Sequence, residues 1–572
     1  MSSDTTAAPV GDPAVAGSRA SRIRKWASAE GIEDYSLRYA PKKFRRWSPF
    51  MVAGAALGGI AYLADYSIGA SVVLTNGAPS GIVGILVAAA IIFVTGVPIS
   101  YYSARYGIDM DLLTRGAGFG YLGSTITSLI YASFTFIFFA LEGSIMAQAL
   151  QFGLGIPLAV GYLITALIVL PLVTYGMSAL AKLQAWTQPL WLVILVLPFV
   201  ALGVAAPEAY GGFFSYTGTN GPGVQILGTG LAAGVALSLI AQIGEQVDYL
   251  RFMPPISETG KLRWWGAVLS AGPGWVIIGA IKQLCGGLLA VYVLAAVGEA
   301  TAEEPITQFV RSLGLLVPGW AAVLLAVVFV LVSQIKINVT NAYAGSLAWS
   351  NFFSRVLHAH PGRFWWIFLN VGIALVLMEV GVFGFLNTVL AFYSNVAIAW
   401  IGAVVADLVI NKPILKLSPN YIEFKRAHLR AVNPVGFGSM VVASVLSILA
   451  YFGLLGEFLA AWSPILAIVV AFVLSPVLCV ATKGRYYLAR TDELTPPLLR
   501  PDGTLETEEL TCGACGVAYE RPDVAQCPFH TSTGMVCSLC CSLEKHCGEI
   551  CKPEGTAADL PMPAVRPAAA AD

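Results

Sequence analysis

Long apolar runs alternate with short polar segments through most of the chain, from about residue 50 to residue 482. An α-helix needs roughly 20 apolar residues to cross the hydrocarbon core of a bilayer, and each run comes close to that length. The pattern therefore predicts an all-α polytopic membrane protein with twelve transmembrane helices. Their expected limits are residues 50–76, 81–104, 124–152, 157–176, 186–206, 225–249, 266–296, 318–347, 364–381, 383–409, 436–455 and 461–482.

Composition agrees with this pattern. Of the 572 residues, 57% are hydrophobic and only 12% are charged. Soluble globular proteins carry about 25% charged residues, so a soluble fold is excluded for most of the chain. The formal net charge is +0, and bulk charge therefore gives no indication of a nucleic-acid partner.

The positions of the basic residues predict the orientation in the membrane. One set of alternate loops is rich in Lys and Arg, whereas the opposite set holds Arg311 beside Glu299, Glu303 and Glu304. Basic loops remain in the cytoplasm, so we expect a multi-pass protein of the cytoplasmic membrane with both termini inside. The basic loop residues are Arg38, Lys42, Lys43, Arg45, Arg46, Arg105, Arg115, Lys182, Arg251, Lys261, Arg263, Arg355, Arg363, Lys412, Lys416, Lys425, Arg426, Arg430, Lys483, Arg485 and Arg490.

The expected span at 318–347 contains Lys336, Asn338 and Asn341 within a largely apolar run. At helical spacing the two asparagines share a face, while Lys336 lies to one side of them. A lysine at that depth costs several kcal/mol unless it is paired or hydrated, so it marks a pathway or a site. The alternative is a lysine that extends to the membrane surface. We interpret this helix as the lining of a polar cavity.

Glu142 lies near the middle of the span at 124–152, with Phe138 one turn before it. A carboxyl group at that depth can carry a proton, accept a hydrogen bond from a ligand N–H group or pair with a lysine. A purely structural Glu–Lys pair is the alternative. Lys282 in the seventh span also requires a partner, for which Glu379 is one candidate.

Asp65 lies in a glycine-rich part of the first span, near Gly58, Gly59 and Gly69. This pattern predicts a weak or broken helix. Transporters expose backbone groups to ions and substrate at such breaks. A packing face of small residues is the competing interpretation.

Beyond the last span, eight of the ten cysteines fall between Cys512 and Cys551. Paired CxxC or CxxH segments place two ligands on one tight turn, which suits tetrahedral zinc, and disulfides are disfavoured in the cytoplasm. The spacing predicts two structural zinc ions. An iron–sulfur cluster and unmetallated redox thiols are the alternatives. The expected zinc ligands are Cys512, Cys515, Cys527, His530, Cys537, Cys540, Cys547 and Cys551.

These patterns divide the chain into five parts. The terminal segments are too polar or too rich in Ala and Pro to bury a core, so we expect them to be disordered. The parts are a basic N-terminal arm at 1–47, a twelve-helix domain at 48–482, a linker at 483–508, a Cys/His-rich zinc domain at 509–555 and a disordered tail at 556–572.

Three segments carry a resemblance to a known family. RYGIDMDLLTRGAGFGYLGS at 105–124 resembles the loop before the third span of the nucleobase–cation symporters, the purine–cytosine permease and hydantoin transporter group. EQVDYLRFMP at 245–254 resembles the end of that family's sixth span, and NAYAGSLAWSN at 341–351 is similar to a stretch of cytosine permeases. The three matches occur in family order, and they cover the membrane part but not the tail.

The resemblance implies a leucine-transporter-type fold of two inverted five-helix repeats, with spans eleven and twelve at the periphery. The substrate would bind at mid-membrane between spans one, three, six and eight. By this resemblance, Phe138 falls where family members stack an aromatic ring on the substrate. Glu142 falls where one member has a Gln that recognises the substrate, and Asn341 falls on an Asn that hydrogen-bonds the heterocycle. Leu239 lies near the place of a Trp that some members stack on the base. The expected substrate-binding set is Phe138, Glu142, Leu239, Gln242, Asn338 and Asn341.

The chain departs from the family at the sodium site. Sodium-coupled members carry a hydroxyl pair before the first Asn of the eighth span, and here these places hold Lys336 and Ile337. We therefore expect that sodium is not the coupling ion and that protons are. Glu142, Lys336 and Asp65 are the expected ion-coupling residues.

The function expected from these observations is secondary active transport of a nucleobase or related planar N-heterocycle. The alternative is a transporter-like receptor that signals to a cytoplasmic protein through its metal-binding tail. The sequence contains no nucleotide-binding loop and no nucleophile constellation, so we expect no enzymatic activity.

Overall fold

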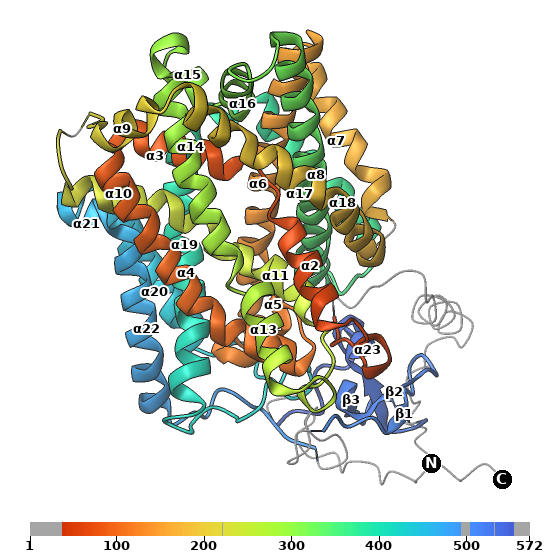
Figure 1. Cartoon of the computed structure of the whole chain (residues 1–572). Coiled ribbons are helices and arrows are strands. Elements are labelled where there is room, and N and C mark those ends of the chain that lie inside the picture. Colours follow the sequence, from red (N-terminus) through yellow and green to blue (C-terminus); the bar gives the residue numbers. More distant parts are fainter. Residues whose placement is uncertain (1–36, 175, 220, 493–503, 531, 554–572) are drawn as a thin grey trace, which may run out of the picture.

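The computed structural model describes residues 37–174, 176–219, 221–492, 504–530 and 532–553, with the backbone alone for 174 and 176–185. Helices form a bundle whose lower end in Figure 1 contacts a small Cys-rich tail domain. We call this end the tail side. Residues 1–36 of the predicted arm at 1–47, and the predicted disordered tail at 556–572, lie outside the described residues.

A helix or an interrupted helix coincides with each of the twelve predicted spans. In chain order they are α2 (Pro49–Gly59) with α3 (Ala64–Asn76), α4 (Ala78–Tyr106), α6 (Ser124–Leu154), α7 (Leu158–Thr174), α8 (Gly176–Ala205), α10 (Ile226–Ala236) with η3 (Leu237–Gln242) and α11 (Ile243–Leu250), α13 (Lys261–Ala271) with α14 (Trp275–Val297), α17 (Gly319–Val356), α18 (Arg363–Glu379), η4 (Val382–Phe385) with α19 (Leu386–Ala406) and η5 (Asp407–Asn411), α20 (Gly436–Tyr451) and α22 (Ser463–Thr482).

Short elements connect these spans. They are η1 (Lys42–Phe44), α5 (Met110–Thr114), η2 (Arg115–Phe119), α9 (Glu208–Ser215), α12 (Ile256–Thr259), α15 (Glu299–Ala302), α16 (Pro305–Leu313) and α21 (Glu457–Ala461). Within the described chain, eight helices are long and apolar enough to cross a membrane, and the bent pair α2–α3 makes a ninth. The shorter α7, α18 and α20 have 17, 17 and 16 residues.

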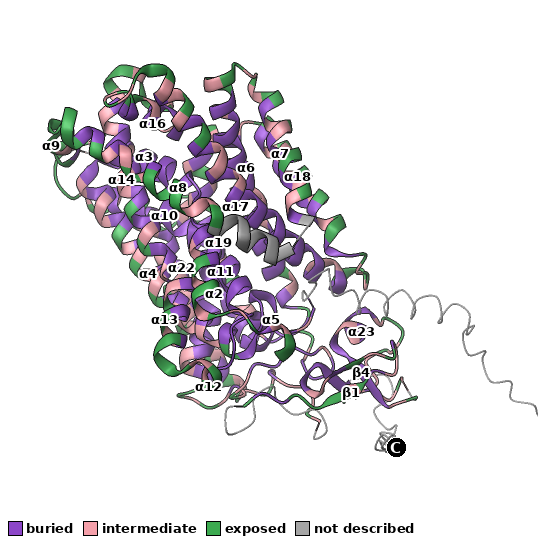
Figure 2. Ribbon diagram, turned by 45° about the vertical axis from the view of Figure 1, so that its right-hand side comes forward, coloured by how far each residue is buried: buried purple, intermediate pink, exposed green. Residues whose placement is uncertain are grey.

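Apolar side chains cover much of the outer surface of the bundle. Exposed positions in Figure 2 follow the outward faces of the peripheral helices, and large aliphatic residues such as Val94, Val193 and Val473 lie on them. In a soluble protein such a surface would aggregate, whereas lipid acyl chains cover it at no cost. The protein is therefore a multi-pass membrane protein.

The first and sixth spans are both interrupted near their middle. A bend of 51° separates α2 from α3, and a 3-10 segment, η3, divides α10 from α11. The two interruptions lie five spans apart, as expected for two repeats of five helices. Interruptions at matching places of two repeats are typical of transporter binding sites.

Glycines bring α14 against the first span. A Cβ atom on Gly69 would lie 1.8 Å from the carbonyl oxygen of Gln283, and one on Gly286 would lie 2.2 Å from that of Tyr66. No other residue fits at these two places. The close approach places side chains of α14 directly on the break between α2 and α3.

The tail domain contains two short hairpins and a helix. Strand β1 (Glu509–Thr511) pairs with β2 (Ala518–Glu520), and β3 (Val524–Gln526) pairs with β4 (Met535–Cys537), both antiparallel. The remaining elements are η6 (Arg521–Asp523) and α23 (Ser538–Leu543). Each hairpin turn carries one of the predicted ligand pairs.

Part of the predicted disordered arm is ordered. Tyr39 is 1% exposed, and its hydroxyl donates to Glu520 Oε2 in the tail over 2.6 Å. Arg45 is buried and donates to the carbonyl oxygens of Met253 and Ala104. Residues 37–47 thus connect the tail domain to the bundle, a result of tertiary contacts that local composition does not predict.

Candidate functional site

The break in the first span is the centre of the candidate site. Helix α2 ends at Gly59 and α3 begins at Ala64, so residues 60–63 are not helical. Glycine is a poor helix former, which favours an end at Gly58–Gly59. A break leaves carbonyl groups without partners at the end of α2 and N–H groups without partners at the start of α3. Both sets require partners in a buried location.

A lysine from α14 donates hydrogen bonds to the carbonyl groups at the break. Lys282 Nζ donates to the carbonyl oxygens of Ile60 over 2.7 Å and Tyr62 over 2.9 Å. It also forms an ion pair of 2.9 Å with Asp65 Oδ2, and both side chains are at most 2% exposed. Gln283 Nε2 donates to Asp65 Oδ1 over 2.9 Å. The predicted broken helix at Asp65 is therefore present, and Lys282 pairs with Asp65 rather than with Glu379.

A glutamate from α6 accepts hydrogen bonds from the N–H groups at the start of α3. The Glu142 carboxylate accepts from the backbone of Leu63 and Ala64 at 3.3 Å. Gln334 of α17 donates Nε2 to the Glu142 carboxylate and, over 3.1 Å, to its carbonyl oxygen. An anionic group at a helix N-terminus is stabilised by the unpaired N–H groups and by the helix dipole. Phe138, one turn from Glu142, is buried against Phe134 at a centroid distance of 4.5 Å.

Two of the predicted substrate residues leave a buried amide donor unused. Gln242 Oε1 accepts from the hydroxyl of Tyr62 over 2.8 Å, and Asn338 Oδ1 accepts from Asn341 over 3.3 Å. Within the described residues, Gln242 Nε2 and Asn338 Nδ2 have no hydrogen-bond partner. Leu239 lies in η3 and is 1% exposed. A buried donor without a partner costs about 1–3 kcal/mol, so a water molecule or a ligand is the expected partner.

Lys336 does not face Glu142, so the structure separates two of the three residues expected to couple transport to an ion. Lys336 Nζ donates to Gln188 Oε1 of α8 over 2.8 Å and lies 5.7 Å from the ring centroid of Trp191. Trp191 in turn donates to Ser333. The physical reason is angular: Lys336 is two residues from Gln334 and Asn338, which places it about 200° around the helix from both. The cation at the break is Lys282.

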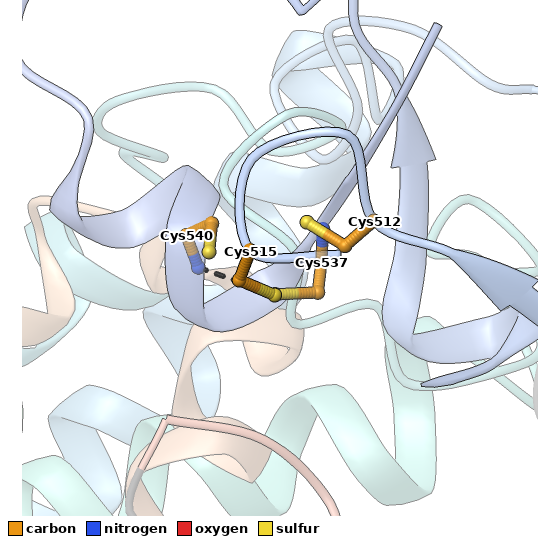
Figure 3. A group of neighbouring side chains, drawn as sticks. All are labelled: Cys512, Cys515, Cys537 and Cys540. Atoms are coloured by element: carbon orange, nitrogen blue, oxygen red, sulfur yellow. Dashed lines mark hydrogen bonds between the residues drawn. The ribbon is translucent and has the colours of Figure 1, made fainter. Parts of the chain in front are cut away.

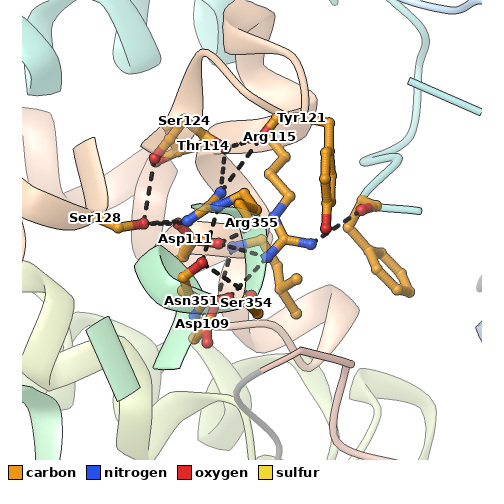
Figure 4. A network of polar contacts seen from close by, with 12 residues as sticks. Asp109, Asp111, Thr114, Arg115, Tyr121, Ser124, Ser128, Asn351, Ser354 and Arg355 are labelled. Atoms are coloured by element: carbon orange, nitrogen blue, oxygen red, sulfur yellow. Dashed lines mark hydrogen bonds and ion pairs between the residues drawn. The ribbon is translucent and has the colours of Figure 1, made fainter. Parts of the chain in front are cut away.

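Buried ion pairs close the tail side below this site (Figure 4). Asp111 of α5 contacts Arg115 at 2.8 Å and Arg355, at the end of α17, at 2.7 Å. Arg115 also donates to Asn351 Oδ1 over 2.7 Å. Asp109 caps α5 by accepting from the backbone of Leu112 and lies 3.8 Å from Arg251 at the end of α11. This network, the tail-side network, ties α5 to the ends of α11 and α17.

Four cysteines of the tail form a candidate metal centre (Figure 3). Their sulfur atoms lie within 4.8 Å of one another, and all four residues are buried. Cys512 and Cys515 come from the turn between β1 and β2, whereas Cys537 and Cys540 lie at the end of β4 and in the first turn of α23. The backbone of Cys537 donates to Cys512 Sγ over 3.3 Å, and that of Cys540 to Cys537 Sγ over 3.4 Å. Such N–H···S bonds orient thiolates around a metal ion.

The structure thus brings together some predicted residues and separates others. Glu142, Asp65 and Gln242 meet at the break, together with Lys282 and Gln334. Gln334 was missed, although it lies four residues before Asn338 on the same helical face. Asp109 and Asp111 were missed as well. The sequence feature that could have indicated them is a pair of acidic residues close to Arg115 at the end of a span. Sequence interpretation treated Arg115 as an orientation signal, whereas it is 2% exposed within the tail-side network.

Comparison with solved structures finds similar chains of low sequence identity. An inward-facing structure of Mhp1 aligns with a TM-score of 0.59 at 18% identity, over 81% of this chain and 100% of that chain. A closed structure of Mhp1, described as a nucleobase-cation-symport-1 family transporter with bromovinylhydantoin bound, gives 0.58 at 17% identity over 80% and 99%. An outward-open Na+-coupled sialic acid symporter gives 0.54 at 14% identity over 81% and 97%. No family model and no curated protein matches the chain.

These likenesses establish the fold. The chain has the predicted all-α membrane fold of leucine-transporter type, with two five-helix repeats and two further helices, and it carries a small Cys-rich tail in addition.

Proposed function

We propose that this protein is a secondary active transporter of an uncharged, planar N-heterocycle, such as a nucleobase or a hydantoin. The observation that carries this proposal is a pair of buried donors, Gln242 Nε2 on the sixth span and Asn338 Nδ2 on the eighth. Neither has a hydrogen-bond partner among the described residues. They would donate to the carbonyl oxygens or ring nitrogens of the heterocycle. Phe138 would supply an aromatic surface, since ring stacking adds about 0.5–1.5 kcal/mol.

The proposed substrate is neutral because the anion position is already filled. Transporters with broken helices bind the anionic group of a substrate at a half-helix N-terminus. Here Glu142 accepts from Leu63 and Ala64 at the start of α3. A substrate carboxylate at the same place would meet a like charge, which disfavours amino acids and other anions.

The proposed coupling ion is the proton rather than sodium. Lys282 Nζ contacts two backbone carbonyl oxygens and one carboxylate oxygen at 2.7–2.9 Å, the oxygen ligands that a bound sodium ion would use at such a break. A tethered ammonium group thus supplies the cation permanently. The replacement of the family's hydroxyl pair by Lys336 and Ile337 supports the same proposal.

Glu142 is the proposed proton carrier. As a carboxylate it holds Leu63, Ala64 and Gln334 together, and so connects α3 to α6 and α17. Protonation removes the charge and converts one oxygen into a donor, which weakens these bonds. The first span could then move relative to α6 and α17. The tail-side network would have to open in the step that releases substrate to the cytoplasm.

We further propose zinc for the four-cysteine centre of the tail. Four thiolates whose sulfur atoms lie within 4.8 Å of one another suit a structural zinc ion, which would hold the two hairpins and α23 together. The same ligands suit iron–sulfur clusters as well, so the metal content of purified protein decides between them. We propose a cytoplasmic location for this tail, because basic residues predominate on the tail side.

Uptake by proteoliposomes tests the proposed function. Labelled uracil, hypoxanthine and a hydantoin should accumulate under an inward proton gradient without sodium, and a protonophore should abolish accumulation. Glu142→Gln should abolish it too, whereas the control Gln148→Ala, on the same helix but outside the site, should leave it unchanged. Strict sodium dependence would contradict proton coupling. Saturable binding without uptake would favour the receptor alternative, which the transporter-like neighbours do not support.

A further inference from the structure

The tail contains a second group of metal-binding side chains. Cys527, His530, Cys541, Cys547 and Cys551 line one cavity of about 20 Å³. This volume holds about one water-sized occupant. All five residues are distinct from the four-cysteine centre, and the cavity also touches Ala427 in the segment between η5 and α20.

Chain order shows why these residues remain available. The first centre takes Cys512 with Cys515 and Cys537 with Cys540, the first and third pairs along the sequence. The second pair, Cys527 with His530, lies in the turn between β3 and β4, and the fourth pair, Cys547 with Cys551, follows α23. Ligand pairs for the first centre alternate along the chain with the two remaining pairs. Folding around the first centre therefore brings the second and fourth pairs to one cavity.

Two further observations indicate ligands rather than ordinary packing. The backbone N–H of His530 donates to the carbonyl oxygen of Cys527 over 3.3 Å, a tight turn that places these two residue types close together in the chain. His530 Nε2 is buried and has no hydrogen-bond partner among the described residues. An imidazole nitrogen in that situation is suited to coordinate a metal ion.

We propose that Cys527, His530, Cys547 and Cys551 bind a second metal ion of the zinc class, interleaved with the first centre. Three thiolates and one imidazole form a ligand set that suits tetrahedral zinc. Cys541 lines the same cavity but follows Cys540 directly, and its carbonyl oxygen is held by Arg426 Nη1 over 2.9 Å. We assign Cys541 to the wall of the site rather than to the ligands.

The second centre lies on the face of the tail that contacts the membrane domain. Arg426 Nε pairs with Glu549 Oε1, between Cys547 and Cys551, at 3.0 Å, and its guanidinium also donates to the carbonyl oxygen of Glu544. Asp492 Oδ2 accepts from the backbone of Gln526, next to Cys527, over 2.9 Å, and also contacts His428 Nε2 at 2.9 Å. The second ion would therefore fix the loop that docks onto residues 426–428, so its occupancy controls how firmly the tail is held.

Metal analysis of the purified full-length protein tests the proposal. We expect two zinc ions per chain, one per chain in Cys551→Ser, and two in both Cys541→Ser and the membrane-embedded control Cys285→Ser. One ion per chain in the wild type, two in Cys551→Ser, or loss of an ion in Cys541→Ser would overturn the assignment. Cobalt-substituted wild type gives a second measurement that does not depend on the folding of Cys551→Ser. A spectrum of tetrathiolate ions alone would also refute the proposal.

Hydrogen–deuterium exchange tests the docking role. In Cys551→Ser, amide exchange over residues 424–430 should rise at least tenfold, while exchange in α6 should stay at the wild-type rate. Unchanged exchange over 424–430 in a variant that has lost one ion would overturn the docking role. Neither measurement depends on transport, so failure of this proposal is distinguishable from failure of the proposed function.

Discussion

Lys282→Met is the most informative perturbation of the break. It removes the cation from an Asp65 carboxylate that is 0% exposed and leaves the carbonyl oxygens of Ile60 and Tyr62 without their donor. Removal of one partner of a buried ion pair costs about 3–5 kcal/mol, because the other charge remains buried and uncompensated. We therefore expect Lys282→Met to lower the free energy of unfolding by about 3–5 kcal/mol, measured by SDS titration in mixed micelles.

A second substitution separates this explanation from a simple packing defect. Asp65→Asn in the Lys282→Met background removes the orphaned charge, so the double variant should regain more than half of the lost stability. A loss below 1 kcal/mol in Lys282→Met, or no recovery in the double variant, would refute the reasoning.

The cavity left by the ammonium group supplies a further test. Lys282→Ala exposes two carbonyl oxygens and the Asp65 carboxylate to a space that a sodium ion can enter. Sodium at ten times its dissociation constant would stabilise this variant by about 1.4 kcal/mol. Its melting temperature should therefore rise with sodium but not with choline, whereas that of the wild type should respond to neither. A wild type stabilised specifically by sodium would contradict the proposed role of Lys282.

Three further predictions concern other parts of the molecule. Asp111→Asn should lower the free energy of unfolding by about 3–5 kcal/mol and raise amide exchange in α5, whereas Asp109→Asn should have a smaller effect, because asparagine keeps the cap and the lost ion pair spans 3.8 Å. Asn338→Leu should reduce the thermal shift produced by heterocycles, because a donor to the ligand is removed; an unchanged ligand response would contradict its role. Burial raises the pKa of Glu423, but Lys425 and His428 outweigh burial and lower this pKa to about 2. The Glu423 carboxylate therefore adds up to about 3 kcal/mol to the free energy of unfolding above pH 4.5, and this stabilisation is lost as the pH falls towards 2. Amide exchange of residues 421–430 should rise below pH 4.5 in the wild type but not in Glu423→Gln.

The sequence by itself determined the membrane architecture. Apolar run lengths predicted the twelve spans, and Gly58 with Gly59 predicted the break in the first span. Cysteine spacing likewise predicted that the pairs Cys512–Cys515 and Cys537–Cys540 hold metal ligands, and these four cysteines come together in the tail. These features are local: each depends on the hydrophobicity, helix propensity or spacing of residues that are neighbours in the chain.

Only the tertiary structure decided which buried charges meet. Lys336 and Lys282 are equivalent in sequence terms, since each is one lysine in an apolar span. Their partners depend on the rotation of α17 and α14 about their axes and on the close approach that Gly69 and Gly286 permit. A rotation of about 100° per residue sends Lys336 towards α8 and Gln334 towards Glu142. Spacing along the chain gives the face of a helix, but the neighbour of that face is set by packing.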